Sequence, residues 1–322
     1  MDFESFVEGP LLWGVFLVFI IGIVTRLVFF FLAITRSAEH KNSKGSFILT
    51  SFGRLFLPFH KAITKRPVYA TLRYIFHICL IVVPIWLGAH IVLWEESRFE
   101  WSWTALPDAW ADWMTLLLLG LAAYFLIRRI VLSDIRTNSS KSDYFLIVMA
   151  ALPFLTGYLL THDSLDPASF LADNMRTIHV LSSEAMLIFA VFLFYRTRLI
   201  AEKCTGCAAC ELSCPTATIA SHDEGRFRTF KYLHYQCTCC GACVDSCPED
   251  AAALRHEIGL GRFFQIASKR EIRSVELKEC EKCGALFAPE PLLGKIRQTI
   301  AESYIQLCPN CKYNHILESQ DT

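Results

Sequence analysis

Long runs of apolar residues, separated by short polar segments, fill the first two hundred positions of the chain. A helix needs about 20 apolar residues to cross a bilayer, and five runs approach that length. We expect membrane-spanning helices at residues 11–34, 74–94, 110–132, 144–160 and 175–195. After residue 200 the chain becomes polar and rich in cysteine, which indicates a separate compact part outside the membrane.

The basic residues are distributed unevenly between the loops that join these helices. Segments 36–73 and 128–141 hold eight and four Lys or Arg, whereas segments 95–112 and 161–174 hold one between them. Because basic loops remain on the cytoplasmic side, we expect a cytoplasmic (inner) membrane protein with its N-terminus outside and its C-terminal part in the cytoplasm. The net charge is zero, so nothing indicates a nucleic-acid partner.

Thirteen of the fourteen cysteines follow residue 203, and eight of them form two consecutive runs of C-x-x-C-x-x-C-x-x-x-C-P. This spacing wraps a cubane iron-sulfur cluster, and the fourth cysteine of each run binds the other cluster. We therefore expect one 4Fe-4S cluster on Cys204, Cys207, Cys210 and Cys247, and a second on Cys237, Cys240, Cys243 and Cys214. Cys239 is an extra thiol in the second run, which we expect to pack or to donate a hydrogen bond to a sulfur.

Two further C-x-x-C pairs lie near the C-terminus. They are formed by Cys280 and Cys283, and by Cys308 and Cys311. Paired knuckles of this kind close a tetrahedral site of four sulfurs around a single ion. We expect structural zinc there, with a redox-active rubredoxin-like iron as the alternative.

Histidines occur inside the expected membrane spans, where an imidazole normally faces the interior of the bundle. His90 in the second span and His179 in the fifth share a depth, which predicts a bis-histidine haem b between these helices. The alternative is that each bonds a backbone carbonyl or contacts lipid headgroups.

His77 lies about 20 Å from His90 along the same helix, which is the separation that two haems stacked across a membrane would require. Helices three to five offer no histidine at the cytoplasmic end to pair with it. We therefore expect one haem b, with two as the alternative. His162 lies at the outer end of the fourth span beside Asp163 and Asp166, where it can be a ligand or a quinone contact.

Two other polar residues within the spans have competing interpretations. Arg26 can pair with a haem propionate or extend to the cytoplasmic interface. Glu184, in the middle of the fifth span, can deliver protons or contact haem, or it can be a protonated structural residue bonded to neighbouring serines.

Four short motifs relate the helical part to a known family: Phe-His-Ile at 76–78, Gly-Ala-His at 88–90, Arg-Thr-Ile-His at 176–179 and the basic segment 196–200. With these motifs the helical part resembles the cytochrome b subunits of the respiratory nitrate reductase gamma family, and their relatives in membrane-bound heterodisulfide reductase and the complex linked to dissimilatory sulfite reductase. In the nitrate reductase type, helices two and five each give two histidines to two haems. The fifth-helix partner of the inner haem would fall at 199–201, where this chain has no histidine.

The segment Cys-Gly-Ala-Leu-Phe-Ala-Pro at 283–289 follows the two cysteine runs. In this position it is similar to the C-terminal extension of the small iron-sulfur subunits of formate hydrogenlyase-type complexes. That resemblance implies a docking surface for a larger catalytic subunit.

The sequence therefore predicts a mainly α membrane protein in three parts. These are a five-helix transmembrane bundle (1–200), a small α+β dicluster ferredoxin domain (201–258) and a rubredoxin-like or zinc-ribbon tail (259–322). We expect an electron-transfer subunit that links a quinone pool to a cytoplasmic oxidoreductase of the hydrogenase, dehydrogenase or disulfide reductase type. The alternatives are a haem-free anchored ferredoxin scaffold and an iron-sulfur redox sensor.

Overall fold

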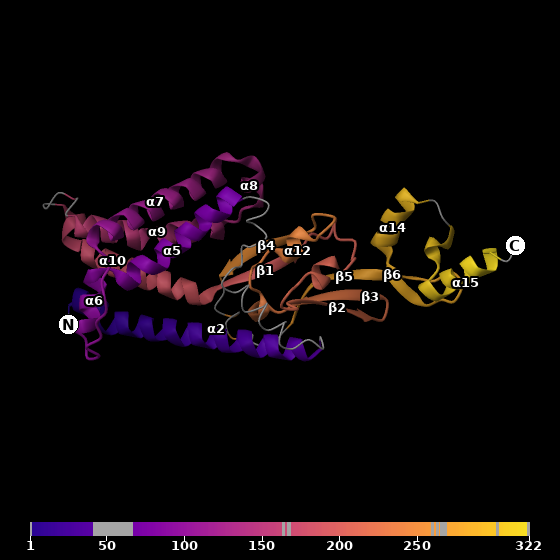
Figure 1. Ribbon diagram of the computed structural model, residues 1–322, viewed down its shortest axis with the longest axis horizontal. Helices are drawn as coiled ribbons and strands as arrows, with labels where there is room; N and C mark the ends of the chain where they lie inside the picture. The colour runs from indigo at the N-terminus through magenta and orange to yellow at the C-terminus, as the bar shows by residue number, and fades with distance from the viewer. Residues whose placement is uncertain are drawn as a thin grey trace. The chain divides into compact units, whose positions relative to one another are not determined.

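A computed structural model shows long helices in the N-terminal part of the chain and a small part with strands and short helices after them (Figure 1). The structure describes residues 2–40, 67–162, 165, 169–258, 261, 264, 269–300 and 303–320. Most of the basic segment 36–73 lies outside these residues, as do Asp163 and Asp166. Two compact units are distinguished, and one boundary between them falls between Leu193 and Phe194.

Five helices in the described part of the chain are long and apolar enough to cross a membrane, which confirms the expected multi-pass fold. The first candidate span, Phe3–Leu32, consists of α1 (Phe3–Phe6), a π-helical turn (Val7–Leu11) and most of α2 (Leu12–His40). The others are α5 (Pro67–Trp86), α7 (Asp108–Val131), α9 (Lys141–Thr161) and α10 (Phe170–Phe192). Two shorter helices, α6 (Gly88–Glu95) and α8 (Ser133–Asn138), lie between them.

Helices α5, α7 and α9 share a buried apolar core. Its members recur every three or four residues, so they lie on one face of each helix: Phe76, Cys79, Val83, Leu118, Leu121, Ala122, Phe125 and Phe154. The opposite faces carry exposed apolar side chains, such as Ile81 at 57% and Ile127 at 58% exposure. An apolar outer surface of this kind is what lipid, rather than water, would solvate.

The second expected span is not continuous, because α5 ends at Trp86 and α6 begins at Gly88. Pro84 lies within the last turn of α5, and Leu87 is extended, with φ −69° and ψ 127°. The carbonyls left open by this break are capped from the following loop. Trp103 Nε1 donates to the Ile85 carbonyl at 2.9 Å, and the Leu106 N–H donates to the Trp86 carbonyl at 2.8 Å.

The fifth helix, α10, ends at Phe192 and leads directly into strand β1 (Leu193–Leu199), so the last residues of the expected span 175–195 are extended. Arg26 of α2 donates to the carbonyls of Ala190 at 3.0 Å, Val191 at 3.2 Å and Leu193 at 2.5 Å. The last carbonyls of a helix lack partners within the helix and carry its negative dipole end. Arg26 therefore caps the C-terminus of α10, a role that the sequence analysis did not include.

The strands form two sheets (Figure 1). β1 pairs with β4 (Ala252–Ile258), and a second sheet has the order β2 (Ile219–Glu224), β3 (Phe227–Tyr232), β5 (Arg270–Glu279) and β6 (Leu286–Pro289), with antiparallel neighbours. The short helices are α11 (Ala209–Leu212), α12 (Ala242–Asp245), α14 (Glu290–Thr299) and α15 (Pro309–Gln320), with 3-10 turns at His234–Gln236 and Ser303–Gln306.

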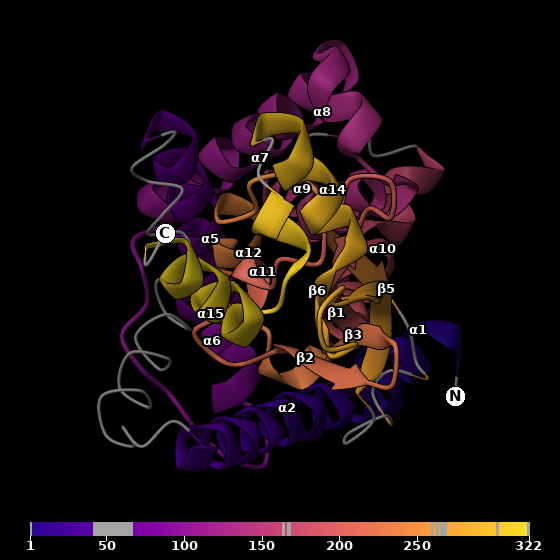
Figure 2. The ribbon, with the colours of Figure 1, turned by 90° about the vertical axis from the view of Figure 1, so that its right-hand side faces the viewer.

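The core of the second unit mixes strand residues with cysteines of both runs. Ile219, Phe230, Tyr232 and Val275 from the strands are buried together with Cys210 and Cys243. α11 and α12, which carry these two cysteines, pack against each other (Figure 2). Cys210 and Cys243 therefore belong to the core of this unit.

We predict that Arg26→Met lowers thermal stability, because three helix-terminal carbonyls lose a charged donor. A hydrogen bond to a charged group contributes about 1.5–3 kcal/mol. Thermal unfolding of the purified protein in detergent measures the effect. The control is Arg98→Met in an exposed turn, and equal destabilisation by both substitutions would contradict the capping role.

Candidate functional site

The two cysteine runs adopt the same backbone conformation. Each residue of the first run has a counterpart 33 positions later, so Cys204 corresponds to Cys237. Three positions in each run have the left-handed conformation, and they match pair by pair: Gly206 and Cys239, Ala208 and Gly241, Ala217 and Asp250. The two halves are therefore related by a pseudo-twofold axis.

Two serines meet at this axis. The Ser246 hydroxyl donates to the Ser213 hydroxyl oxygen at 2.7 Å. Ser213 also lies 3.3 Å from the Ala242 carbonyl, and its counterpart Ser246 lies 3.4 Å from the Ala209 carbonyl. Each serine thus contacts the first residue of the short helix in the opposite half, and these contacts hold α11 and α12 together.

The cysteines assigned to the first cluster surround one cavity, which we call site 1. Its lining includes Cys204, Cys207, Cys210 and Cys247. Burial raises the pKa of the Cys204 thiol, and negative charge on Cys207 and Cys247 raises it further. Cys247 of the second run therefore lies next to the first three cysteines of the first run, as the crossed assignment requires.

The cysteines assigned to the second cluster, which we call site 2, show the reciprocal arrangement. Burial is the main cause that raises the pKa of Cys237 to about 12 and that of Cys243 to about 11, and Cys214 of the first run contributes to both shifts through its charge. Cys240 contributes in the same way to the shift of Cys243. Site 2 thus brings Cys214 to Cys237, Cys240 and Cys243.

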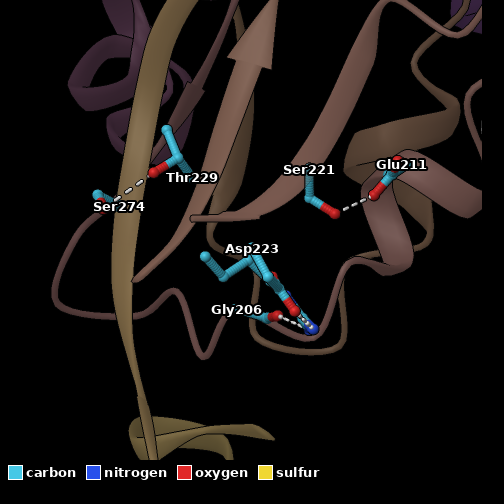
Figure 3. A network of polar contacts seen from close by, with 7 residues as sticks. Gly206, Glu211, Ser221, Asp223, Thr229 and Ser274 are labelled. Atoms are coloured by element: carbon cyan, nitrogen blue, oxygen red, sulfur yellow. Dashed lines mark hydrogen bonds and ion pairs between the residues drawn. The ribbon is translucent and has the colours of Figure 1, made fainter. Parts of the chain in front are cut away.

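The polar contacts of β2 and β3 hold the loop of the first run in place (Figure 3). Arg228 forms a bidentate ion pair with Asp223, with N···O distances of 2.7 and 2.8 Å, and donates to the Gly206 carbonyl at 3.4 Å. Ser221 of β2 donates to the carboxylate of Glu211 in α11 (Figure 3). The strands therefore position both the loop and the helix that carry ligands of site 1.

The four C-terminal cysteines form a compact group whose sulfurs all lie within 4.8 Å of one another: Cys280, Cys283, Cys308 and Cys311. The sulfurs of Cys283 and Cys308 are 3.7 Å apart. A tetrahedral ion with metal–sulfur bonds of about 2.3 Å places its ligands roughly 3.8 Å apart. The spacing therefore fits a single metal ion, zinc or iron, and is too short for a cubane cluster.

Backbone hydrogen bonds prepare this group for a metal. The Cys308 N–H donates to the Cys280 sulfur at 3.2 Å. This bond is the main reason that the pKa of the Cys280 thiol lies below its usual value. A stabilised thiolate is the form that binds a metal.

In the helical unit, the imidazoles of His90 on α6 and His179 on α10 lie close together. Their ring centres are 6.1 Å apart, and the ring planes differ by 18°. With metal–nitrogen bonds of about 2 Å, two imidazoles on opposite sides of one iron have ring centres roughly 6 Å apart. The two rings are therefore far enough apart for one metal ion to lie between them, and both could bind it.

Backbone carbonyls hold both rings. His90 Nδ1 lies 2.9 Å from the Pro84 carbonyl, and His179 Nδ1 lies 3.0 Å from the Pro153 carbonyl. A carbonyl can only accept, so each Nδ1 carries a proton, which in a neutral imidazole leaves Nε2 as the nitrogen that can bind a metal. On α9, a Cβ at Gly157 would lie 3.0 Å from His179 Cε1, so the glycine makes room for this ring.

The other two histidines lie elsewhere. His77 on α5 has its Nδ1 2.7 Å from the Arg73 carbonyl and packs edge-on against Phe76. His162 Nε2 lies 3.3 Å from the carboxylate of Asp112 at the start of α7. The structure thus brings His90 and His179 together, and it places His77 and His162 in other surroundings.

Glu184 is buried in the middle of α10, with 4% of its surface exposed. Its Oε1 has no hydrogen-bond partner among the described residues. A carboxyl group in this setting avoids charge unless it gains a partner, which fits a protonated residue.

Comparison with known proteins agrees with the geometry of the cysteine runs. Residues 203–252 match the family model of the 4Fe-4S dicluster domain. This segment is a dicluster domain. The chain is also similar to a protein of Nitratidesulfovibrio vulgaris strain Hildenborough, with 29% identity over 195 residues that cover 58% of this chain and 84% of that protein. The similarity to that protein is much longer than the domain match, so it extends beyond the dicluster domain.

The dicluster domain has buried polar groups that fit its two clusters. Thr205 and its counterpart Thr238 each follow the first cysteine of a run, and both hydroxyls are buried without a partner among the described residues. The N–H groups of Thr218 and Ala251 donate to the sulfurs of Cys214 and Cys247, each at 3.2 Å. Cluster sulfurs and thiolates are acceptors, so they would satisfy both hydroxyls.

Burial also couples cluster binding to proton release. It is the main cause that raises the pKa of Cys210 to about 12, as it does for Cys237. Before iron binds, these thiols are protonated at neutral pH. Only thiolates bind iron, so cluster insertion releases these protons.

Cys239 occupies a backbone position that favours glycine. Its φ is 56°, and its counterpart Gly206 has φ 76°. The sequence analysis considered only packing and hydrogen bonding for this thiol. The 33-residue repeat, which aligns Cys239 with a glycine, was the signal that could have identified its position.

We predict opposite effects for two substitutions at this pair. Gly206→Ala places a Cβ 3.0 Å from Pro289 at a left-handed φ, so it should destabilise the domain by about 1–2 kcal/mol or more. Cys239→Gly removes left-handed strain of about 1 kcal/mol and should keep both clusters. Loss of cluster absorbance on heating measures both effects, and loss of a cluster in Cys239→Gly would show that this thiol is a ligand.

We also predict that Cys280→Ser loses one equivalent of zinc or iron and retains the iron of both clusters, because the four-sulfur group is a site of its own. Elemental analysis together with the spectrum of the clusters measures this. Cys79→Ser, in the core of the helical bundle, is the control and should retain every metal. Unchanged metal content in Cys280→Ser would contradict the single-ion site.

Proposed function

We propose that this chain is the membrane electron-transfer subunit of a respiratory complex, and that it passes electrons between a quinone pool and a cytoplasmic oxidoreductase. The chain combines a dicluster domain with five candidate membrane spans. The observation that carries the finer proposal is the His90–His179 pair, with its ring spacing of 6.1 Å and its protonated Nδ1 atoms. These residues would hold one haem b, which supplies one-electron transfer within the membrane.

The chain itself links the two kinds of cofactor. His179 lies on α10, and α10 leads without a connecting loop into β1 of the dicluster fold. Thr197 of this strand contacts Cys243 of site 2 at 3.7 Å. A single continuous segment therefore carries a proposed haem ligand at one end and a contact to a cluster ligand at the other.

The distribution of basic residues supports the proposed orientation, with the N-terminus outside and the dicluster domain in the cytoplasm. A cytoplasmic catalytic subunit of the hydrogenase, dehydrogenase or disulfide reductase type would then exchange electrons with the clusters. We propose the tail, with its four-cysteine site and the amphipathic helix α14, as the surface that docks this subunit. The resemblance to cytochrome b subunits of the nitrate reductase gamma and heterodisulfide reductase types supports the same assignment.

The distance along α10 supports a second carrier on the cytoplasmic side. The helix continues for thirteen residues from His179 to Phe192, which is about 20 Å at 1.5 Å per residue. Electron transfer slows steeply with distance, so a carrier at the depth of His77 would shorten the path. We propose His77 as one ligand of that carrier. A stoichiometry of two haems per chain would support this carrier, and a stoichiometry of one would contradict it.

We predict that the dithionite-reduced minus oxidised spectrum shows haem b, and that His179→Ala abolishes it while about eight cluster irons remain. Gly157→Val should weaken haem binding as well, because its side chain would displace the His179 ring. Gly120→Val is the matched control, since a Cβ there has no neighbour within 4 Å. Pyridine haemochrome and iron determinations on each variant give the stoichiometry.

Two other results would lead to different functions. Wild-type protein without haem but with full cluster iron would contradict the cytochrome assignment and leave an anchored ferredoxin scaffold. Haem and clusters that do not turn over with quinone, in protein that copurifies with no oxidoreductase, would favour a redox sensor.

A further inference from the structure

The two cluster sites share one fold, but their surroundings differ chemically. The 33-residue repeat gives each residue around site 2 a counterpart around site 1. Three buried hydroxyl groups contact cysteine sulfurs at site 2, and none of their three counterparts at site 1 has a hydroxyl group. The comparison is internal to the domain, so differences between the sites come from side chains rather than from the backbone.

Two threonines contact the sulfurs of site 2. Thr197 of β1 lies 3.7 Å from the sulfur of Cys243, and Thr216 lies 3.7 Å from that of Cys214. Both threonines are 1% exposed. Thr218 lies 2.8 Å from Thr216 and can donate to it, so the Thr216 proton remains available to Cys214. A ligating thiolate can only accept, so both threonines act as donors.

A tyrosine adds a third donor at site 2. Tyr232 of β3 forms a side-chain hydrogen bond with Cys237 and is 3% exposed. Together with Thr197 and Thr216 it gives three of the four site 2 cysteines a hydroxyl donor. Hydrogen bonds in a buried environment are electrostatically stronger than in water.

The counterparts at site 1 are Phe230 for Thr197, Glu249 for Thr216 and Leu199 for Tyr232. All three line the site 1 cavity. Two are hydrocarbon side chains, and the third is a carboxylate that is paired with Lys295. In place of three donors, site 1 therefore has apolar contacts and an acidic group.

One charge acts in the opposite direction. Arg273 lies close enough to Cys204 to lower the pKa of that thiol. Its guanidinium is partly buried: Nε lies in the interior, whereas Nη2 donates to the Ala201 carbonyl at 3.2 Å at the surface, where solvent screens part of the charge. Glu249 and Lys295 form an ion pair at the same site, so together they add little net charge there. The buried donors at site 2 are not screened in this way, so we expect them to dominate the difference.

We propose that site 2 has the higher reduction potential of the two clusters and holds the first electron. Reduction adds one electron and one unit of negative charge to a cluster and its thiolates, without making or breaking a bond. Hydrogen bonds to the sulfurs stabilise that extra charge. An electron that enters the domain therefore moves to site 2, which is reduced as site 1 is reoxidised. The inference requires the two clusters but neither the haem nor the quinone.

The test is a potentiometric titration of the full-length protein, followed by electron paramagnetic resonance, with dithionite as the reductant. Wild type should give two one-electron couples. Thr197→Val, Thr216→Val and Tyr232→Phe should each lower the higher couple and leave the lower one unchanged. The expected shift is up to about tenfold in the reduction equilibrium, which is about 59 mV for one electron.

The symmetric pair Thr205 and Thr238 supplies an internal control. Thr205→Val should lower only the lower couple, because Thr205 lines site 1. Thr238→Val should lower only the higher couple, because Thr238 is the counterpart of Thr205 in the second run. Thr197→Ser retains a donor and should titrate as wild type does. The iron content of each variant shows whether both clusters are present. If one site 2 variant loses a cluster, the other two site 2 variants still decide which cluster has the higher reduction potential.

Two results would overturn the proposal. One is a shift of the lower couple by the site 2 variants, which would invert the order of the clusters. The other is no shift in any of the three variants that retain their iron. His179→Ala tests haem binding, and the site 2 variants test the order of the cluster potentials. If His179→Ala loses haem and both cluster couples stay unchanged, this inference is unaffected, so the two proposals can fail independently.

Discussion

In the crossed assignment of ligands, each cluster site takes three cysteines from one half of the dicluster domain and one from the other, and this exchange would constrain the whole domain. Neither half can complete a site alone, so the two halves must fold against each other. Ser213 and Ser246 meet where the halves join, and the packing of α11 against α12 follows from that contact. β1 and β3 each end a few residues before the first cysteine of a run, and β1 begins directly after α10.

The sequence was most informative where chemistry requires a fixed spacing. The cysteine runs and the paired knuckles predicted which sulfurs would meet, because a cluster or a tetrahedral ion tolerates few geometries. Apolar run length predicted five spans for the same reason, since the bilayer has a fixed thickness. The break at Leu87 was not predicted, although Pro84 is visible in the sequence, because proline in a membrane helix permits a break without requiring one.

Other features depend on contacts between residues that are distant in sequence. Arg26 caps α10 across 164 to 167 positions, and no local pattern around Arg26 indicates that partner. Gly157 makes room for His179 from a neighbouring helix, so its importance is visible only once α9 and α10 are packed. The left-handed position of Cys239 was present in the sequence, but only through alignment of the two runs with each other.

The two proline carbonyls suggest why the bundle departs from regular helices near the histidine pair. A helical carbonyl is normally used by the N–H four residues later, so an imidazole cannot donate to it without sharing. The break after Trp86 removes that competition for the Pro84 carbonyl, and His90 takes its place. The Pro153 carbonyl is shared with His179 and Thr156. In both cases a carbonyl accepts a hydrogen bond from Nδ1, so that Nε2 is the nitrogen that could bind a metal. The irregular backbone at Leu87 therefore serves the haem binding that we propose for His90.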